Sequence, residues 1–392
     1  MNRIAGVKKN RRTLLKKPLV ALALLALCLP GTALAADQNP LEGLSVSLQG
    51  FAEYSAGQTG KDTAAQESFN KFSLTRGYVT LKKKVNPWLA ARVTTDIHQV
   101  DGSWEVRLKY LYGEVKAGNL GFLTGIKSEI GLGHTPWLDF EEHINPYRAQ
   151  GPMLTDRGGM QTSSDIGVSL AGDFGGKLEN AKERTGSSHY TGRYGSWHIG
   201  IYNGAGYHDA EANQNKVAEA RITLRPLADV LPGLKLSYLG TFGKGNTADA
   251  PDYNLNLGMV SFQHPYFILT GQYFASKGNF KGSLVDANGK ALDSTGYGAF
   301  GVVHLPVLQK KLSVFGRYDH ANNDDNHKLA KDADYSMAVG GVSYDLDKGN
   351  MILVDYEKVT YGANSGGMGK NPVLAKNLGD DERVQVVYQF QF

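Results

Sequence analysis

Residues 383–392 read RVQVVYQFQF, and the alternation in this stretch decides the fold. Side chains on a β-strand alternate between its two faces. One face then carries Val384, Val386, Tyr388, Phe390 and Phe392. The opposite face carries Arg383, Gln385, Gln389 and Gln391. An apolar, aromatic-rich face opposite a polar face is typical of a wall between lipid and a water-filled lumen. The stretch therefore predicts a transmembrane β-strand.

Fifteen further segments show the same period of two. They span residues 44–56, 72–83, 88–98, 104–112, 120–127, 165–174, 197–203, 217–225, 234–242, 253–262, 266–274, 297–304, 312–319, 335–344 and 351–359. In residues 104–112, Trp104, Val106, Leu108, Tyr110 and Tyr112 are expected to share one face.

The links between the segments alternate in length. Long polar links alternate with tight turns such as Asn86-Pro87 and Gly118-Asn119, although the link 175–195 is long where a short one is expected. Short turns on one side, long loops on the other and an even strand count are the plan of bacterial outer-membrane barrels. The sequence therefore predicts an all-β fold: an antiparallel transmembrane β-barrel of about 16 strands, with short periplasmic turns and long extracellular loops. A secreted β-sandwich would also show short alternating strands, but it gives no reason for loop lengths to segregate along the whole chain.

The first 35 residues have the three parts of a secretory signal peptide. A basic region is followed by an apolar run from Leu19 to Leu29 and by the small residues around Ala35 and Ala36. We therefore expect cleavage after Ala35 or Ala36, which leaves residues 36–392 as a single barrel domain. The alternative is a lipoprotein signal that ends at Cys28, where Leu27 stands in place of the small residue expected before the cysteine.

Cleavage changes the charge and the cysteine count. Seven of the 42 Lys and Arg lie in the signal and none of the 38 Asp and Glu, so the remaining chain has 35 basic and 38 acidic residues. This balance argues against binding to nucleic acid. Cys28 is the only cysteine, so the exported chain has no thiolate metal site and no Cys-x-x-Cys-His haem attachment.

Charged side chains on the polar faces of the segments are predicted to line the lumen, where rings of charge set the ion preference of a pore. These predicted pore-lining residues are Arg76, Arg92, Asp96, Arg107, Lys109, Arg221, Arg317, Asp355 and Glu357. Many of them also have a simpler role, because opposite charges on neighbouring strands pair and fix strand register.

A long third loop at about 130–163 is predicted either to cap the mouth of the barrel or to narrow its channel. Its charged constriction-loop candidates are Asp139, Glu141, Glu142, Arg148, Asp156 and Arg157. His134 and His143 lie beside these carboxylates, but spacing alone does not predict a metal site, and we expect none. The loop has no lysine and is net acidic.

We expect no enzyme and no cofactor. The chain has no Gly-x-Ser-x-Gly elbow, no His-Glu-x-x-His motif and no phosphate-binding P-loop. An outer-membrane hydrolase would need a nucleophile, a base and an orienting group on one barrel face, and the sequence indicates no such set.

The stretches Gly50–Tyr54, Leu74–Lys82 and Asn86–Leu89, together with the terminal Phe392, resemble bacterial outer-membrane porins of the phosphate-selective porin O and P type. The resemblance implies a sixteen-strand barrel, commonly trimeric, that passes small solutes. Members that select phosphate carry arginine ladders and lysine clusters near the constriction, which the acidic third loop does not match. The third loop is also similar to that of porin-like proteins of metal-respiring deltaproteobacteria, some of which hold multihaem cytochromes.

Two functions follow as hypotheses. The first is an outer-membrane porin for passive diffusion of small hydrophilic solutes or ions. The second is a sleeve for a periplasmic or extracellular multihaem cytochrome. The expected partners are outer-membrane lipid and lipopolysaccharide, two further copies in a homotrimer, and the barrel assembly machinery, which would recognise Tyr388, Phe390 and Phe392 as an assembly signal.

Overall fold

The computed structural model describes residues 41–60, 66–100, 102–373 and 377–392. The predicted signal peptide, residues 1–35, lies outside them. Gly43–Phe392 form one compact unit. Within the described residues, no helix is long and apolar enough to cross a membrane.

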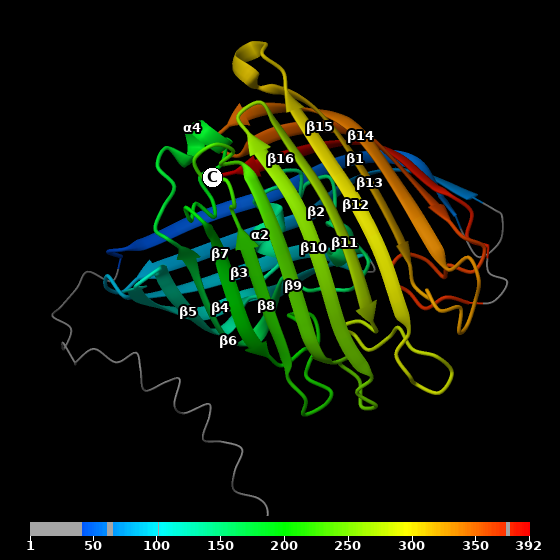
Figure 1. The fold of residues 1–392 in the computed structure, drawn as a ribbon. Helices are drawn as coiled ribbons and strands as arrows, with labels where there is room; N and C mark the ends of the chain where they lie inside the picture. The colour runs from blue at the N-terminus through cyan, green and yellow to red at the C-terminus, as the bar shows by residue number, and fades with distance from the viewer. Residues whose placement is uncertain (1–40, 61–65, 101, 374–376) are drawn as a thin grey trace, which may run out of the picture. The chain divides into compact units, whose positions relative to one another are not determined.

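The described residues form sixteen strands, as predicted (Figure 1). Their bounds are β1 Leu44–Gly60, β2 Gln66–Lys84, β3 Leu89–Val100, β4 Ser103–Leu120, β5 Leu123–His134, β6 Ser164–Phe174, β7 Gly195–Tyr202, β8 Val217–Leu224, β9 Leu234–Lys244, β10 Asp252–His264, β11 Phe267–Lys277, β12 Asp293–His304, β13 Leu312–Asn322, β14 Asp334–Asp347, β15 Asn350–Tyr361 and β16 Asp381–Gln391.

The strands close into an antiparallel barrel in which each pairs with its neighbours in sequence. The last strand returns to the first: β16 pairs with β1 from Gln49 opposite Gln391 to Gln58 opposite Glu382. Closure satisfies the backbone groups of both terminal strands and leaves no free sheet edge along this seam. The chain adopts the fold of a transmembrane β-barrel.

Alternation along the strands separates an apolar outer face from a mixed inner face. On β16, Val384, Val386 and Tyr388 are exposed on the outside, while Gln385 and Val387 are fully buried on the inside. The same division along β8 buries Glu219 and Arg221 and exposes Ile222 and Leu224.

The prediction for β4 is wrong at two positions. The register between β3 and β4 shifts, with Thr94 opposite Tyr110 and Thr95 opposite Leu108, so Lys109 is an extra residue on β4. Such a β-bulge changes which side chains face inward beyond it. Tyr110 and Tyr112 are therefore buried inside the barrel rather than exposed beside Trp104 and Val106.

Two connections carry helices. The loop 135–163 between β5 and β6, called L3 below, contains the short helices α2 (Leu138–Glu142) and α3 (Leu154–Arg157). The link 175–194 between β6 and β7 contains α4 (Ala181–Thr185). A 3-10 turn, η1 (Leu308–Lys310), lies between β12 and β13.

Candidate functional site

L3 folds into the barrel and packs against the inner wall. Trp137, Leu138 and Phe140 have no exposed surface and belong to a cluster with Leu239 and Tyr253 of the wall. This burial is the reason that the inner faces of β9, β10 and β11 carry apolar side chains where a water-filled pore would carry polar ones. The loop therefore fills the side of the lumen next to these strands.

Polar contacts fix L3 to the wall as well. The Arg221 Nε donates to the carbonyl of Pro136 at 2.8 Å, and the Arg317 Nη1 donates to that of Pro152 at 2.8 Å. The Tyr253 hydroxyl donates to the carbonyl of Met160 at 2.7 Å. Among the described residues Arg221 has no ion pair, so the carbonyl of Pro136 satisfies a buried group that would otherwise be costly. Arg317 also pairs with the Asp319 carboxylate.

An ion-pair cluster holds the far end of L3. Arg157 contacts Glu357 at 3.0 Å, and Arg383 contacts the same carboxylate at 3.1 Å. Gln150 donates to Glu357 at 2.7 Å and its carbonyl accepts from Gln385 at 2.9 Å. Two segments of L3 thus share one carboxylate on β15.

Glu141 lies between L3 and the wall and is held there by neutral donors. Its carboxylate accepts from Trp137 Nε1 at 2.8 Å and from Gln272 Nε2 at 2.7 Å. Burial raises the pKa of Glu141 to about 7, although these two hydrogen bonds partly oppose the rise. Its charge state therefore changes near neutral pH.

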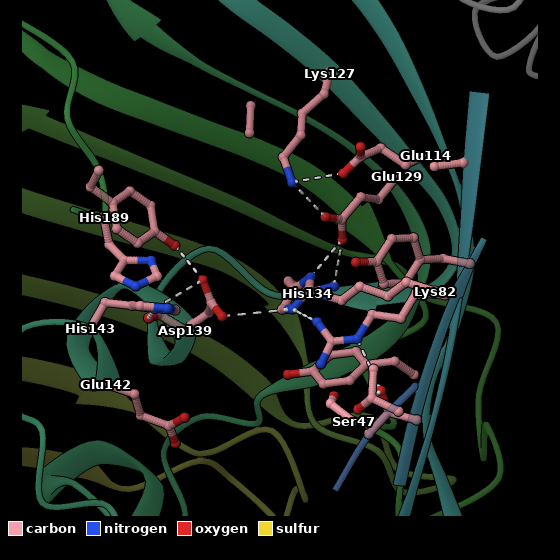
Figure 2. A pocket seen from close by; sticks show the side chains of 18 of the residues that line it. Ser47, Lys82, Glu114, Lys127, Glu129, His134, Asp139, Glu142, His143 and His189 are labelled. Atoms are coloured by element: carbon pink, nitrogen blue, oxygen red, sulfur yellow. Dashed lines mark hydrogen bonds and ion pairs between the residues drawn. The ribbon is translucent and has the colours of Figure 1, made fainter. Parts of the chain in front are cut away.

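A cavity of about 1200 Å³ lies on the other side of L3. It is lined by the inner faces of β1 to β8 and β16, part of L3, and the inward side of the link 175–194. Ten Lys and Arg and five Asp and Glu line it. This cavity is the candidate functional site, and Figure 2 shows the charged and imidazole side chains that project into it.

The wall of the cavity on β2 and β3 carries two opposed cations. Lys82 lies directly across from Arg92 in the strand register. Arg92 donates to the Thr94 hydroxyl at 2.9 Å and lies 3.2 Å from His134 Nε2. Among the described residues, neither cation has an ion pair with a carboxylate. Like charges directly opposite each other are destabilising, so this pair costs stability.

A third cation, Lys109, lies at the β4 bulge. Its Nζ donates to the Tyr78 hydroxyl at 3.4 Å and lies 4.4 Å from the centre of the Tyr78 ring. Tyr110 and Tyr207 lie within 6.0 Å of the same ammonium group. In the part of the chain that the structure describes, Lys109 forms no ion pair, so aromatic side chains stabilise its charge.

Most carboxylates of the cavity are neutralised by neighbours. Glu142 pairs with Arg148 at 2.9 Å. Glu129 accepts from Lys127 at 3.1 Å and from His134 at 2.8 Å. Lys127 also contacts Glu114 at 3.1 Å. The charges that remain uncompensated on the wall of β2, β3 and β4 are therefore positive.

The predicted pore-lining residues all face inward but divide into three groups. Arg92, Lys109 and Arg221 line the cavity. Arg76 and Arg107 both contact Asp96, at 2.9 and 3.1 Å, nearer to the β3–β4 hairpin.

The third group, Arg317, Asp355 and Glu357, does not line this cavity. These three residues were expected to face water in the pore. Instead, L3 covers this part of the wall. Arg317 and Glu357 contact L3 directly, and Asp355 accepts a hydrogen bond from Gln385 at 3.0 Å.

The predicted constriction-loop residues divide in the same way. Asp139, Glu142 and Arg148 line the cavity. Glu141 faces the wall, and Arg157 pairs with Glu357. Asp156 lies 3.6 Å from Arg148 and supports it.

Sequence reasoning missed Lys82, Tyr110, His189 and Tyr190. Lys82 could have been found, because it alternates with Tyr78 and Thr80 on one face of β2. Tyr110 was hidden by the bulge. No local pattern placed His189 and Tyr190 in the lumen, since the link that carries them was expected among the short turns.

The described residues hold no group of three or more His, Cys, Asp or Glu placed to bind a metal ion. His134 and His143 contact Asp139 instead, at 3.7 and 3.5 Å.

No protein-family model matches the sequence, and no curated protein matches it. Solved structures are similar in fold. The anion-selective porin from Comamonas acidovorans has a TM-score of 0.59 and 11% identity, with 89% of this chain and 100% of that chain covered. OmpF of Salmonella typhi, in complex with daunomycin, has a TM-score of 0.58 and 12% identity, with 89% and 97% covered. OmpT of Vibrio cholerae in its trimer form has a TM-score of 0.53 and 12% identity, with 90% and 100% covered. At such identities the likeness shows a shared fold, the sixteen-strand barrel of outer-membrane porins.

Proposed function

We propose that this protein is an outer-membrane channel for passive diffusion of small hydrophilic solutes, with a preference for anions. The observation that carries the proposal is the set Lys82, Arg92 and Lys109, three cations on adjacent strands that line the cavity and have no carboxylate partner among the described residues.

The physical argument concerns which charges a passing ion meets. A carboxylate paired with a cation about 3 Å away has a weak field beyond the pair, whereas an unpaired cation acts at longer range. Low-dielectric walls concentrate that field inside a narrow lumen. Glu114, Glu129 and Glu142 are paired, so anions are attracted to the wall formed by β2, β3 and β4 and cations are repelled by it.

Phosphate selectivity in particular is not proposed. The phosphate-selective type implies lysine clusters near the constriction, and L3 contributes none. The basic residues lie on the barrel wall, with two carboxylates of L3, Asp139 and Glu142, across the cavity. This arrangement supports a general preference for anions.

The cytochrome sleeve has no support in the fold. A sleeve needs a lumen wide enough for a folded protein, and L3 occupies one side of this lumen. The remaining cavity of about 1200 Å³ suits small solutes.

The proposal includes location and assembly. We place the barrel in the outer membrane, in contact with lipid and lipopolysaccharide, as a homotrimer. The apolar outer faces of the strands support the membrane location. The trimer form of the Vibrio cholerae OmpT structure, which has the same fold, supports the homotrimer.

Planar-bilayer recordings test the proposal. Folded protein should give stepwise conductance, and a salt gradient should give a reversal potential that shows chloride passing more readily than potassium. Neutralising the wall with Lys82→Gln, Arg92→Gln and Lys109→Gln should shift this reversal potential toward zero. The matched control Lys348→Gln, in the exposed turn between β14 and β15, should not shift it. Folded protein without conductance steps would contradict the proposed channel. A preference for cations would contradict the proposed preference for anions.

A further inference from the structure

The link 175–194 between β6 and β7 reaches into the lumen instead of remaining at the rim. Its base is anchored on the neighbouring turn: Arg184 donates to the carbonyls of Ala228 and Asp229, and Arg193 contacts the Asp229 carboxylate at 2.7 Å. From this base the chain carries His189 into the wall of the cavity (Figure 2), and Tyr190 lines the cavity as well.

There the link meets L3. The rings of His143 and His189 lie 4.0 Å apart between centroids. The Tyr190 hydroxyl donates to the Asp139 carboxylate at 2.5 Å, and its ring packs edge-on against Phe140 at 5.0 Å. We call the group Asp139, His143, His189 and Tyr190 the histidine clasp. It joins the two inward-folded segments of the lumen, and all four of its members line the cavity.

The clasp contains one carboxylate, Asp139, which lies 3.5 Å from His143. Asp139 is already shared, since Tyr190 donates to it and His134 of β5 lies 3.7 Å from its other oxygen. A proton on His189 would place a positive ring 4.0 Å from the His143 ring, beside a carboxylate that other groups already contact.

The other charged groups around the clasp disfavour a proton on His189 as well. Arg221 of β8 lies over Phe140 and Tyr190, at 4.2 and 5.1 Å from the ring centres. The positive charge of Lys235 on β9 also disfavours it. Burial, and then the neighbouring His143, lower the pKa of His189 below its ordinary value of about 6.5. Burial raises the pKa of Tyr190 well above its usual range, so Tyr190 remains a neutral donor.

We propose that the histidine clasp is an acid-sensitive gate: protonation of His189 separates the link 175–194 from L3 and widens the channel. The gate belongs to the proposed channel and so rests on the proposed function. Both segments line the cavity and touch each other at the clasp, so their separation enlarges the space open to a solute.

The pH window follows from the direction of the shift. A histidine whose pKa is lowered in the clasped state stabilises that state fully above the ordinary histidine pKa of about 6.5, and this stability is lost as the pH falls below it. Each extra proton taken up on opening changes the equilibrium by at most about ten-fold per pH unit. We expect the wide state to grow by up to that factor per pH unit below about pH 6.5.

The test pairs a conductance measurement with one that needs no conductance. Single channels of the full-length protein should occupy the wider state more often in acid, by up to about ten-fold for each pH unit below about pH 6.5. His189→Phe keeps a ring against His143 but cannot bind a proton, so it should remove the acid response. His327→Gln, which changes an exposed histidine in the loop between β13 and β14, should respond to acid as the original protein does.

Hydrogen exchange of the folded barrel provides the second measurement. The backbone bond from Leu178 N–H to the Thr191 carbonyl, at 2.7 Å, ties the two arms of the link together. Amide protection against exchange is measured for peptides from 175–194 and corrected for the effect of pH on the intrinsic exchange rate. This protection should fall in acid in the original protein and should not fall in His189→Phe. Equal protection at both pH values, or the same loss in His189→Phe, would overturn the gate. If protection against hydrogen exchange falls in acid but the protein shows no conductance, the proposed channel is overturned, while opening of the clasp in acid is still supported.

Discussion

The ring of Phe390 lies over Gly50 at the seam where β16 closes the barrel on β1. The two residues are directly opposite in the strand register. A Cβ atom added to Gly50 would lie 2.2 Å from the Cζ atom of Phe390, so the ring fills the space that a side chain would occupy. An aromatic ring that covers a glycine on the neighbouring strand shields the backbone there and helps to set the register.

Substitution of Gly50 by Val should therefore weaken closure. The new side chain collides with the Phe390 ring, and overpacking of this kind costs about 1–3 kcal/mol. The temperature at which the folded band disappears in unheated electrophoresis should fall. Combining Gly50→Val with Phe390→Ala removes the collision and should recover part of the loss. A Gly50→Val protein as stable as the original would show that the ring is free to move away.

Deletion of Phe392 should lower the fraction of correctly inserted, heat-resistant barrel in cells. Phe392 exchanges two backbone hydrogen bonds with Leu48, at 2.9 and 3.1 Å, and its exposed ring is the last part of the proposed assembly signal. Phe392→Ala keeps the backbone bonds and removes only the ring. If the signal role is correct, both variants should assemble poorly in cells but refold well in detergent. If Phe392→Ala assembles normally, any defect of the deletion comes from the lost backbone hydrogen bonds and not from the ring.

Glu357→Gln should release the far end of L3. The substitution leaves the guanidinium groups of Arg157 and Arg383 without their shared carboxylate, and loss of one partner from a buried ion pair costs about 3–5 kcal/mol. Trypsin should then cut after Arg157 in the folded barrel, and the open channel should become noisier. Asp355→Asn is the matched control on the same face of β15, because Asp355 accepts from Gln385 and forms no ion pair within the described residues. Equal resistance to trypsin in both variants would show that apolar packing alone holds L3.

Glu141 should make the barrel less stable as the pH rises. Its raised pKa of about 7 means that the folded state favours the protonated carboxyl, so this stability is full below the ordinary glutamate pKa of about 4.3 and is lost as the pH rises through about 7. The melting temperature in detergent should therefore fall as the pH rises from about 4 to about 7, by the equivalent of at most about 4 kcal/mol.

Glu141→Gln should remove this dependence. The amide that the substitution introduces can still accept from Trp137. It can also donate to the side-chain oxygen of Gln272 once the Gln272 amide turns over, because that oxygen has no hydrogen-bond partner among the described residues. Glu142→Gln is the control, since Glu142 pairs with Arg148 in the cavity. If the melting temperature of Glu141→Gln still falls as the pH rises, another residue is the titrating group.

The strands and their inward faces could be predicted from local pattern. An alternation such as that of Val384, Val386 and Tyr388 needs no knowledge of distant contacts, because the geometry of a strand alone sends alternate side chains to opposite sides. The same reasoning put Arg92 and Glu357 on the inner face; in the structure Arg92 lines the cavity and Glu357 contacts L3. It failed at Tyr110, because a bulge is set by the pairing of two strands and leaves the period of each unchanged elsewhere.

What the sequence by itself determined is therefore the wall: sixteen alternating strands, the inward and outward faces of most of them, and a long L3. Only the tertiary structure decided which part of the interior is a channel. L3 packs on one side of the lumen, so Arg317 and Glu357 became its anchors while Lys82, Arg92 and Lys109 remained open to the cavity. The reason is physical. Facing inward is a local property of a strand, whereas exposure to the pore depends on which segment covers that face, and the segments that meet at the histidine clasp are about 50 residues apart in the chain.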